Sequence, residues 1–197
     1  MPEIRHTAAE PSGGADLGEL PSWDLSDLYS APDCAEIKRD LDWLKVETAS
    51  FAADYEGKLA GQGAADMLRV IERYEAVNSI MGRIMSYAGL SYYQNTSDTE
   101  RAKFMSDMQG AITDLSNPLV FFSLEMNRID DAVLAGLMAE STGLARYKPV
   151  IDRMRAMKPY QLSDELEKFL HDNSVVGAAA WNRLFDETMA GLTFDVD

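Results

Sequence analysis

Histidines, a cysteine and paired carboxylates are the residues of this chain whose types could do chemistry. The only two histidines, His6 and His171, lie far apart in the sequence. A hydrolytic zinc site typically places two histidines four residues apart on one helix face, as in His-Glu-x-x-His, because the two imidazoles then converge on one ion. Neither histidine has such a partner. We therefore predict no metal ligand in this chain, a solvated His6, and a His171 that interacts with the dipole at a helix end.

The single cysteine, Cys34, is the one thiol nucleophile available. A catalytic thiol needs a histidine base or an electropositive setting, whereas the neighbouring Asp33 and Glu36 are acidic. We expect Cys34 to pack as a small apolar side chain. One cysteine cannot form an internal disulfide, which fits a reducing compartment and predicts a cytoplasmic protein.

Three pairs of adjacent carboxylates could bind a hard cation. Adjacent acids near helix ends are more often solvated or capping groups, because the helix dipole favours negative charge at the N-terminus. We assign that role to all three pairs, so the sequence predicts no catalytic residue and identifies no substrate-binding residue. The pairs are Asp130-Asp131, Asp164-Glu165 and Asp186-Glu187.

The excess of acidic over basic side chains limits which partners the chain can bind. The chain has 197 residues, with 33 acidic and 18 basic side chains and a net charge of -15. Phosphate backbones and anionic lipid surfaces would repel it, so we expect no nucleic-acid partner. The most apolar run, residues 175–181, is far shorter than a membrane span, and we expect no membrane partner. Residues 1–20 lack an apolar run and are predicted to form a flexible leader before one helical domain over residues 21–197.

Apolar residues recur at helical spacing along most of the chain, which predicts an all-α fold of about seven helices. The longest stripe runs from Met67 to Tyr92 and is wide enough to face a core. The next helix is expected to begin with a capping box of Ser97 and Glu100 and to continue to Phe122. Because the turn between these two helices is short, they should form a long antiparallel hairpin.

Proline, glycine and serine mark where the other helices begin, bend or end. Pro118 is expected to kink the second hairpin helix, because it removes a backbone donor. The first helix should be capped by Asp33 and closed by Gly57, Ser163 should cap a later helix, and Gly191 should stop the last one. The remaining helices are predicted over residues 130–138, 144–154, 163–172 and 175–189.

Eleven methionines could line an adaptable peptide groove. Most of them fall on the helical stripes with isoleucine, leucine and tyrosine. We therefore expect ordinary core packing for most of them.

The last six residues, 192–197, alternate between apolar and polar side chains, which predicts a short β-strand. A lone strand has no partner for its backbone amide and carbonyl groups. We infer that the chain was cut here or continues into a larger protein.

Five blocks of the sequence, taken together and in order, resemble the N-terminal part of oligoendopeptidase F. This family consists of zinc metallopeptidases related to thimet oligopeptidase. The resemblance runs from about Leu20 to the end of the chain. The blocks are Leu20-Pro21-x-Trp23-x-Leu25-x-Asp27-Leu28-Tyr29, Gly82-Arg83-Ile84-x-Ser86-Tyr87-Ala88, Phe121-Phe122-Ser123-Leu124-Glu125, Pro159-Tyr160-x-Leu162-Ser163-x-Glu165-x-Glu167 and Ala180-Trp181-x-Arg183-Leu184-Phe185-Asp186-Glu187.

The resemblance implies a cytoplasmic, largely helical peptidase that cuts short peptides inside a channel. In such enzymes two histidines and a glutamate of one helix, with a further glutamate downstream, hold and use the zinc. None of these catalytic residues can be assigned to a position in this chain. The resemblance therefore implies that the chain has no catalytic activity of its own and forms part of the wall of the channel. Its partners would be the missing C-terminal catalytic domain and, in the whole enzyme, short peptides. Self-association through exposed apolar residues near 181–196 is a further expectation.

A second hypothesis comes from a different class of protein. The chain could be a stand-alone helical module, without enzymatic activity, that binds peptides or a partner protein.

Overall fold

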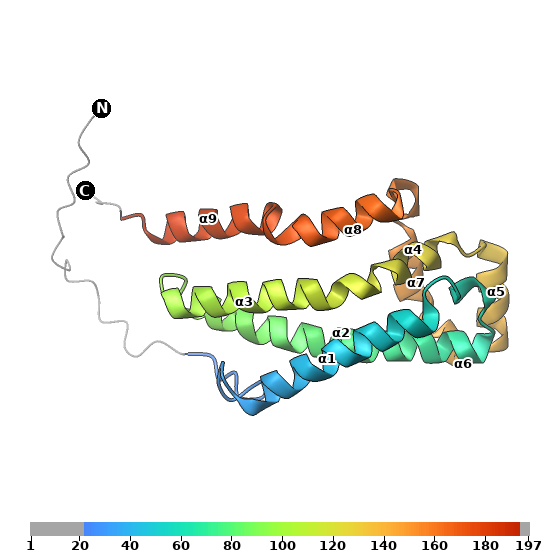
Figure 1. The fold of residues 1–197 in the computed structure, drawn as a ribbon, viewed down its shortest axis with the longest axis horizontal. Helices are drawn as coiled ribbons and strands as arrows, with labels where there is room; N and C mark the ends of the chain where they lie inside the picture. Colours follow the sequence, from blue (N-terminus) through green and yellow to red (C-terminus); the bar gives the residue numbers. More distant parts are fainter. Residues whose placement is uncertain (1–21, 194–197) are drawn as a thin grey trace.

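The computed structural model describes residues 22–193, and these residues form an all-α fold, as predicted. Three long helices lie side by side, shorter helices gather at one end of them, and α8 and α9 return along α3 as an outer layer (Figure 1). The α-helices are α1 (Ala35–Tyr55), α2 (Ala64–Gln94), α3 (Thr99–Ser116), α4 (Val120–Arg128), α5 (Asp131–Glu140), α6 (Thr142–Ala145), α7 (Lys148–Arg155), α8 (Asp164–Asp172) and α9 (Ala178–Ala190).

Helices α2 and α3 form the predicted antiparallel hairpin (Figure 1). Helix α2 has 31 residues and is therefore roughly 46 Å long. Its predicted apolar stripe faces the core, where it meets Leu44 and Phe51 of α1 and Phe122 of α4. The stripe residues that are buried are Met67, Val70, Ile71, Val77, Met81, Ile84, Ala88 and Tyr92.

Pro118 divides the second hairpin helix as predicted. Helix α3 ends at Ser116, the 3₁₀ turn η2 (Asn117–Leu119) follows, and α4 begins at Val120. The predicted helix over residues 144–154 is likewise divided, into α6 and α7, and Pro149 lies in the first turn of α7. The seven predicted helices are all present, and two of them each form two segments.

Two predicted N-caps are wrong. Helix α3 is capped by Asp98, not by Ser97: the Asp98 carboxylate accepts hydrogen bonds from the amides of Glu100 (2.9 Å) and Arg101 (3.2 Å). The Ser97 amide instead donates to Asn95 Oδ1 (3.2 Å), which holds Ser97 in the preceding turn. Asp33 does not cap α1, because the N-cap position is Cys34, whose side chain makes no capping bond.

The helix ends marked by glycine are confirmed. Gly57 follows the end of α1 with a φ of 77°, the left-handed conformation that glycine adopts most readily. Gly191 stands at the C-cap of α9. Ser163 occupies the predicted N-cap of α8, but its side chain makes no capping bond.

The two ends of the chain fall outside the described residues. The predicted leader over residues 1–20 lies there, and so does the predicted strand from Phe194 onward. Leu192 and Thr193, the first two residues of that prediction, are in no regular structure. Among residues 22–193, every helix is too short or too polar to cross a membrane.

A buried polar cluster joins the entry segment to α1 and α2. Asp40 of α1 is only 4% exposed. Its carboxylate accepts a hydrogen bond from the Tyr29 hydroxyl (2.8 Å) and forms an ion pair with Arg83. Arg83 of α2 thus points toward α1. Burial opposes the charged form of Asp40, but the hydrogen bonds from Tyr29, Arg39 and Arg83 outweigh it and hold the pKa of Asp40 below 3.8.

This cluster predicts how stability depends on Asp40 and on pH. Replacing Asp40 by Asn leaves Arg83 without its buried counter-charge, and we expect a loss of about 2–3 kcal/mol in the free energy of unfolding. Because the folded-state pKa is depressed, this contribution is present above the ordinary pKa of 3.8 and is lost as the pH falls through the lower folded value.

Urea unfolding of the wild type and of Asp40→Asn at a series of pH values would measure both effects. The gap between the two proteins should shrink below about pH 4. A gap that stays constant with pH would contradict a stabilising role for the ionised carboxylate of Asp40.

Candidate interaction surface

Helices α8 and α9 form an outer layer that runs along α3 (Figure 1). They are joined by the 3₁₀ turn η4 (Asn173–Val175) and by Gly177, and Gly191 ends the layer. No residue of either helix is fully buried. How each helix is turned about its own axis therefore decides which side chains this layer presents to solvent.

Polar side chains of α8 face the bundle. Asp164 forms a bidentate ion pair with Arg128 of α4, in which Arg128 Nη1 lies 3.1 Å from Asp164 Oδ2. Lys168 Nζ lies 3.3 Å from Glu56 Oε1 at the end of α1. These contacts, with that of His171 described below, fix the polar side of α8 against α4, α1 and α3.

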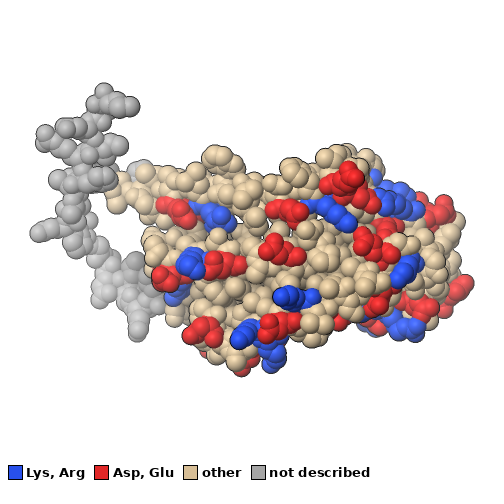
Figure 2. All heavy atoms as spheres, in the orientation of Figure 1, with Lys and Arg blue, Asp and Glu red and all other residues tan. Residues whose placement is uncertain are grey.

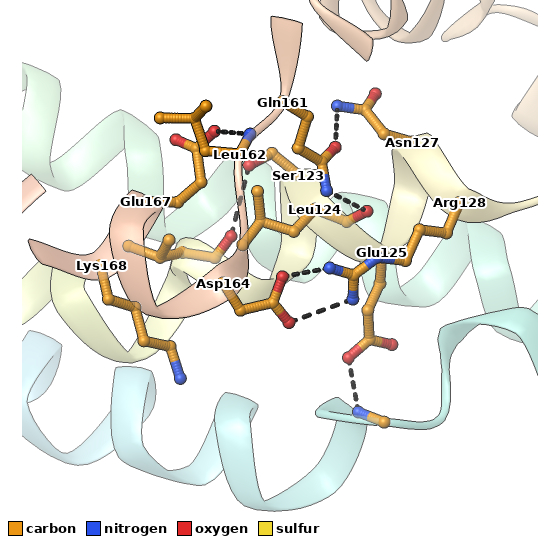
Figure 3. A network of polar contacts seen from close by, with 12 residues as sticks. Ser123, Leu124, Glu125, Asn127, Arg128, Gln161, Leu162, Asp164, Glu167 and Lys168 are labelled. Carbon is orange, nitrogen blue, oxygen red and sulfur yellow. Dashed lines mark hydrogen bonds and ion pairs between the residues drawn. The ribbon is translucent and has the colours of Figure 1, made fainter. Parts of the chain in front are cut away.

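Polar contacts near two of the blocks that carry the resemblance fix the junction between α4 and the segment that leads into α8 (Figure 3). Asn127 Nδ2 donates to Gln161 Oε1 (2.9 Å), and the amide of Leu162 donates to Glu167 Oε1 (2.8 Å). On the other side of α4, Glu125 Oε1 accepts a hydrogen bond from the Gly57 amide (2.6 Å). Of these residues, Glu125, Leu162 and Glu167 belong to the blocks, and their hydrogen bonds position helices.

His171 reaches α3 in a geometry that sequence reasoning missed. Its Nε2 lies 2.9 Å from Ser116 Oγ and 3.3 Å from the carbonyl oxygen of Thr113. A serine next to a histidine resembles a nucleophile and its base, but such a pair also needs a third group that orients the imidazole. No carboxylate of the described residues makes a hydrogen bond to His171. We interpret the pair as a structural contact that holds α8 against α3.

A cavity of about 670 Å³ lies beside His171, between α2, α3, α4 and α8. Its walls mix apolar side chains with a few polar groups, and it is open to solvent on one side. It could not be predicted from the sequence, because its lining comes from segments far apart in the chain. Its polar lining residues include Asn78, Ser116, Ser123, Glu167 and His171.

Helix α9 is also turned with its polar side inward. Arg183 Nη1 donates to Gln109 Oε1 of α3 (2.8 Å). Trp181 lies two positions from Arg183, which is about 200° around a helix, and it is 70% exposed. Phe185, one turn further along the same side as Trp181, is 64% exposed. The small Ala179 and Ala180 share the half-buried inner side with Arg183.

The outward sides of α8 and α9 together form one apolar stripe, which we call the outer stripe. On each helix its members recur at spacings of three and four residues, as on one helix face. In Figure 2 the outer edge of the α9 rod is mostly uncharged, and the charged groups lie along the edge that faces α3. The outer stripe consists of Leu166 and Phe169 of α8, Trp181, Leu184, Phe185 and Met189 of α9, and Leu162, Val176 and Leu192 beside the helix ends, all of which are exposed. Leu170 is also exposed, but it lines the cavity.

Most carboxylates of α8 and α9 lie on the side of the bundle. Asp172 Oδ1 accepts a hydrogen bond from Asn117 Nδ2 (2.7 Å), and Asp186 and Glu187 follow Arg183 by three and four positions and so share its side of α9. Asp186 and Glu187 also lie near Tyr92 of α2: burial is the main cause that raises the pKa of Tyr92, and these two charges add to it. The Tyr92 hydroxyl is buried and has no hydrogen-bond partner among the described residues.

The other residues considered for chemistry are in structural positions. Cys34 is half-buried and packs against the core, as predicted. Asp130 caps α5 as predicted, accepting from the Ala132 amide (2.8 Å). Asp131 and Asp164, which we expected to be solvated or capping, are exposed to solvent and in addition form ion pairs with Arg155 and Arg128. Within residues 22–193 no three side chains with metal-ligand atoms come together.

Comparison with known proteins points to one family. A family model described as Oligopeptidase F matches residues 125–194, which run from within α4 to just past α9. The chain is a distant relative of the N-terminal region of oligoendopeptidase F. The matched residues include the whole outer stripe.

Individual oligoendopeptidases F support this relationship. The plasmid oligoendopeptidase F of Lactococcus lactis subsp. cremoris and an oligoendopeptidase F homolog of Lactococcus lactis subsp. lactis are each 22% identical over 155 residues, covering 79% of this chain and 25% of the relative. The crystal structure of oligoendopeptidase-F from Enterococcus faecium matches with a TM-score of 0.70 at 22% identity, over 84% of this chain and 31% of that chain. The chain thus shares the fold and spans about a quarter of the length of the curated relatives.

The contact between Ser116 and His171 predicts a measurable contribution to the docking of α8. Replacing either residue by Ala removes a half-buried hydrogen bond, and we expect each change to lower the free energy of unfolding by about 1 kcal/mol. The double variant should lose little more than the larger single loss, because both changes remove the same contact. Urea unfolding of the four proteins would measure this coupling, and fully additive losses would show that the two side chains act independently.

Proposed function

We propose that this chain is the non-catalytic N-terminal helical region of a zinc-dependent, cytoplasmic oligoendopeptidase that hydrolyses short peptides. In this proposal the helices form part of the wall of the substrate channel, and the outer stripe packs against the rest of the peptidase. The distant relationship to oligoendopeptidase F supports the enzyme class.

One observation carries the docking role: α8 and α9 point their polar sides inward and their apolar sides outward. Trp181 and Phe185 are 70% and 64% exposed, although large aromatic side chains usually supply core or interface contacts. An isolated domain gains stability by turning such residues inward. A layer with the opposite orientation is expected when a further layer covers it. The segment that carries this layer is also the segment that the family model matches.

The described residues do not fit a zinc site. His171 is their one histidine, and its Nε2 is engaged by Ser116 and by the carbonyl oxygen of Thr113. A catalytic zinc needs three protein ligands that converge on one point. In the proposed enzyme the zinc and the residues that activate water would therefore belong to the remaining part of the protein.

The proposal predicts that purified residues 1–197 carry no stoichiometric zinc and do not cleave a quenched fluorogenic peptide. Metal analysis after dialysis and a peptidase assay with added zinc would measure both. Metal-dependent turnover that copurifies with the chain would contradict a non-catalytic role.

The coding sequence beyond codon 197 separates the proposal from the stand-alone module. We expect it to encode His-Glu-x-x-His in the same reading frame. A stop codon directly after Asp197 would favour a helical binding module without enzymatic activity.

A further inference from the structure

The cavity beside His171 has the size and the walls of a site for a small organic molecule. Its volume is about 670 Å³, and small-molecule sites commonly measure about 300–1,000 Å³. A molecule that filled it would contact α2, α3, α4 and α8 at once. Most of its lining is apolar, and these apolar side chains include Tyr74, Met81, Met85, Ile112, Leu119 and Leu170.

Glu167 gives the lining its charge. Among the described residues that line the cavity there is no lysine or arginine, and Glu167 is the one carboxylate. It is partly buried and makes no ion pair within residues 22–193. Its Oε1 accepts a hydrogen bond from the Leu162 amide (2.8 Å), which leaves Oε2 able to accept another (Figure 3). A partly buried carboxylate without a counter-charge favours a cationic ligand.

The other polar groups of the lining use most of their donors within the protein. The Thr113 carbonyl oxygen can only accept, and it lies 3.1 Å from Ser116 Oγ and 3.3 Å from His171 Nε2. Ser116 therefore donates to Thr113 and accepts from Nε2–H across 2.9 Å, which leaves Nδ1 of the neutral imidazole as an acceptor. Ser123 likewise donates to the Val120 carbonyl oxygen (3.3 Å). The hydrogen-bonding capacity left for a ligand is thus mainly that of acceptors.

We propose that this cavity binds a small amphiphilic amine, a molecule with an aromatic or branched apolar body and one protonated amino group. An ammonium group donates three hydrogen bonds and accepts none, which suits a lining of acceptors around the Glu167 carboxylate. A carboxylate or phosphate ligand would meet the charge of Glu167 with no lining cation to offset it. The net charge of -15 adds to the attraction for cations.

Three indoles with different side-chain charges would test the preference. Tryptamine is cationic, tryptophol is neutral and indole-3-acetate is anionic. We expect isothermal titration calorimetry on the full 197-residue chain to show tryptamine binding about ten-fold tighter than tryptophol at low salt, because a hydrogen bond between charged groups is the stronger one. Indole-3-acetate should bind most weakly. The advantage of tryptamine should shrink at about 0.5 M NaCl, because salt screens the attraction.

A charge variant and its matched control test the role of Glu167. Glu167→Gln keeps the size of the side chain and removes its charge, so it should abolish the advantage of tryptamine and leave tryptophol binding unchanged. Glu165→Gln removes the same charge from an exposed position of α8 outside the lining, and it should leave the binding of both compounds unchanged.

A second variant tests the location of the site. Gly82 of α2 lines the cavity, and a Cβ added there has no atom within 4 Å. Gly82→Phe should therefore place a ring in the cavity without displacing the backbone and should weaken the binding of every indole. Gly136→Phe on α5, where an added Cβ also has no atom within 4 Å, is the control and should change nothing. Circular dichroism would show that both variants keep the fold.

The same chemistry is present at the amino terminus of a peptide that begins with tryptophan. An amidated tripeptide of tryptophan and two alanines, with its N-acetylated form, would distinguish this source from a free amine. Tighter binding of the tripeptide than of tryptamine, lost on acetylation, would identify a peptide terminus as the ligand. Tighter binding of tryptamine would identify a free amine.

The contrary results are specific. Equal affinity for tryptamine and tryptophol would overturn the preference for an amine, and so would an advantage that Glu165→Gln lowers as much as Glu167→Gln does. Binding that Gly82→Phe leaves unchanged would overturn the assignment to this cavity, and absence of binding by every compound would overturn the site itself. The metal analysis and the peptidase assay test the non-catalytic role separately.

Discussion

The polar contacts that hold α8 and α9 against the bundle are the constraint on which the functional surface depends. Asp164 pairs with Arg128, His171 meets Ser116, and Arg183 meets Gln109. A helix whose polar side is fixed inward must present its other side to solvent. The aromatic and aliphatic side chains of the two helices are therefore exposed to solvent, although their spacing along the sequence is that of a buried helix face.

The remainder of the fold shows the usual arrangement. In α1, α2 and α4 the apolar sides meet in one continuous core, and the one buried carboxylate there, Asp40, is satisfied by Tyr29 and Arg83. None of the buried residues of this core comes from α8 or α9. The outer layer can therefore have a composition suited to binding, because the fold does not need its apolar residues inside.

Sequence periodicity predicted the helices well and their orientation poorly. Spacing gives the stripe on α2 and the stripe on α9 equally clearly, but it does not say whether a stripe faces inward. That direction comes from pairs such as Arg183 with Gln109, whose members are 74 residues apart. The N-cap of α3 was misplaced by one residue because both Ser97 and Asp98 are good caps, and the hydrogen bond from the Ser97 amide to Asn95 decides between them. The contact of His171 with Ser116 could not be predicted either, because the two residues are 55 positions apart in the sequence.

The orientation of α9 is the central claim, and cysteine labelling measures it most directly. In a Cys34→Ser background, Phe185→Cys would place a single thiol on the outer side of α9. In the same background, Ala180→Cys would place a single thiol on its inner side. The structure predicts that the thiol at position 185 reacts with a maleimide reagent at least about ten-fold faster than the thiol at position 180, because reaction follows exposure. Equal rates, or a faster reaction at position 180, would contradict an outward-facing apolar stripe.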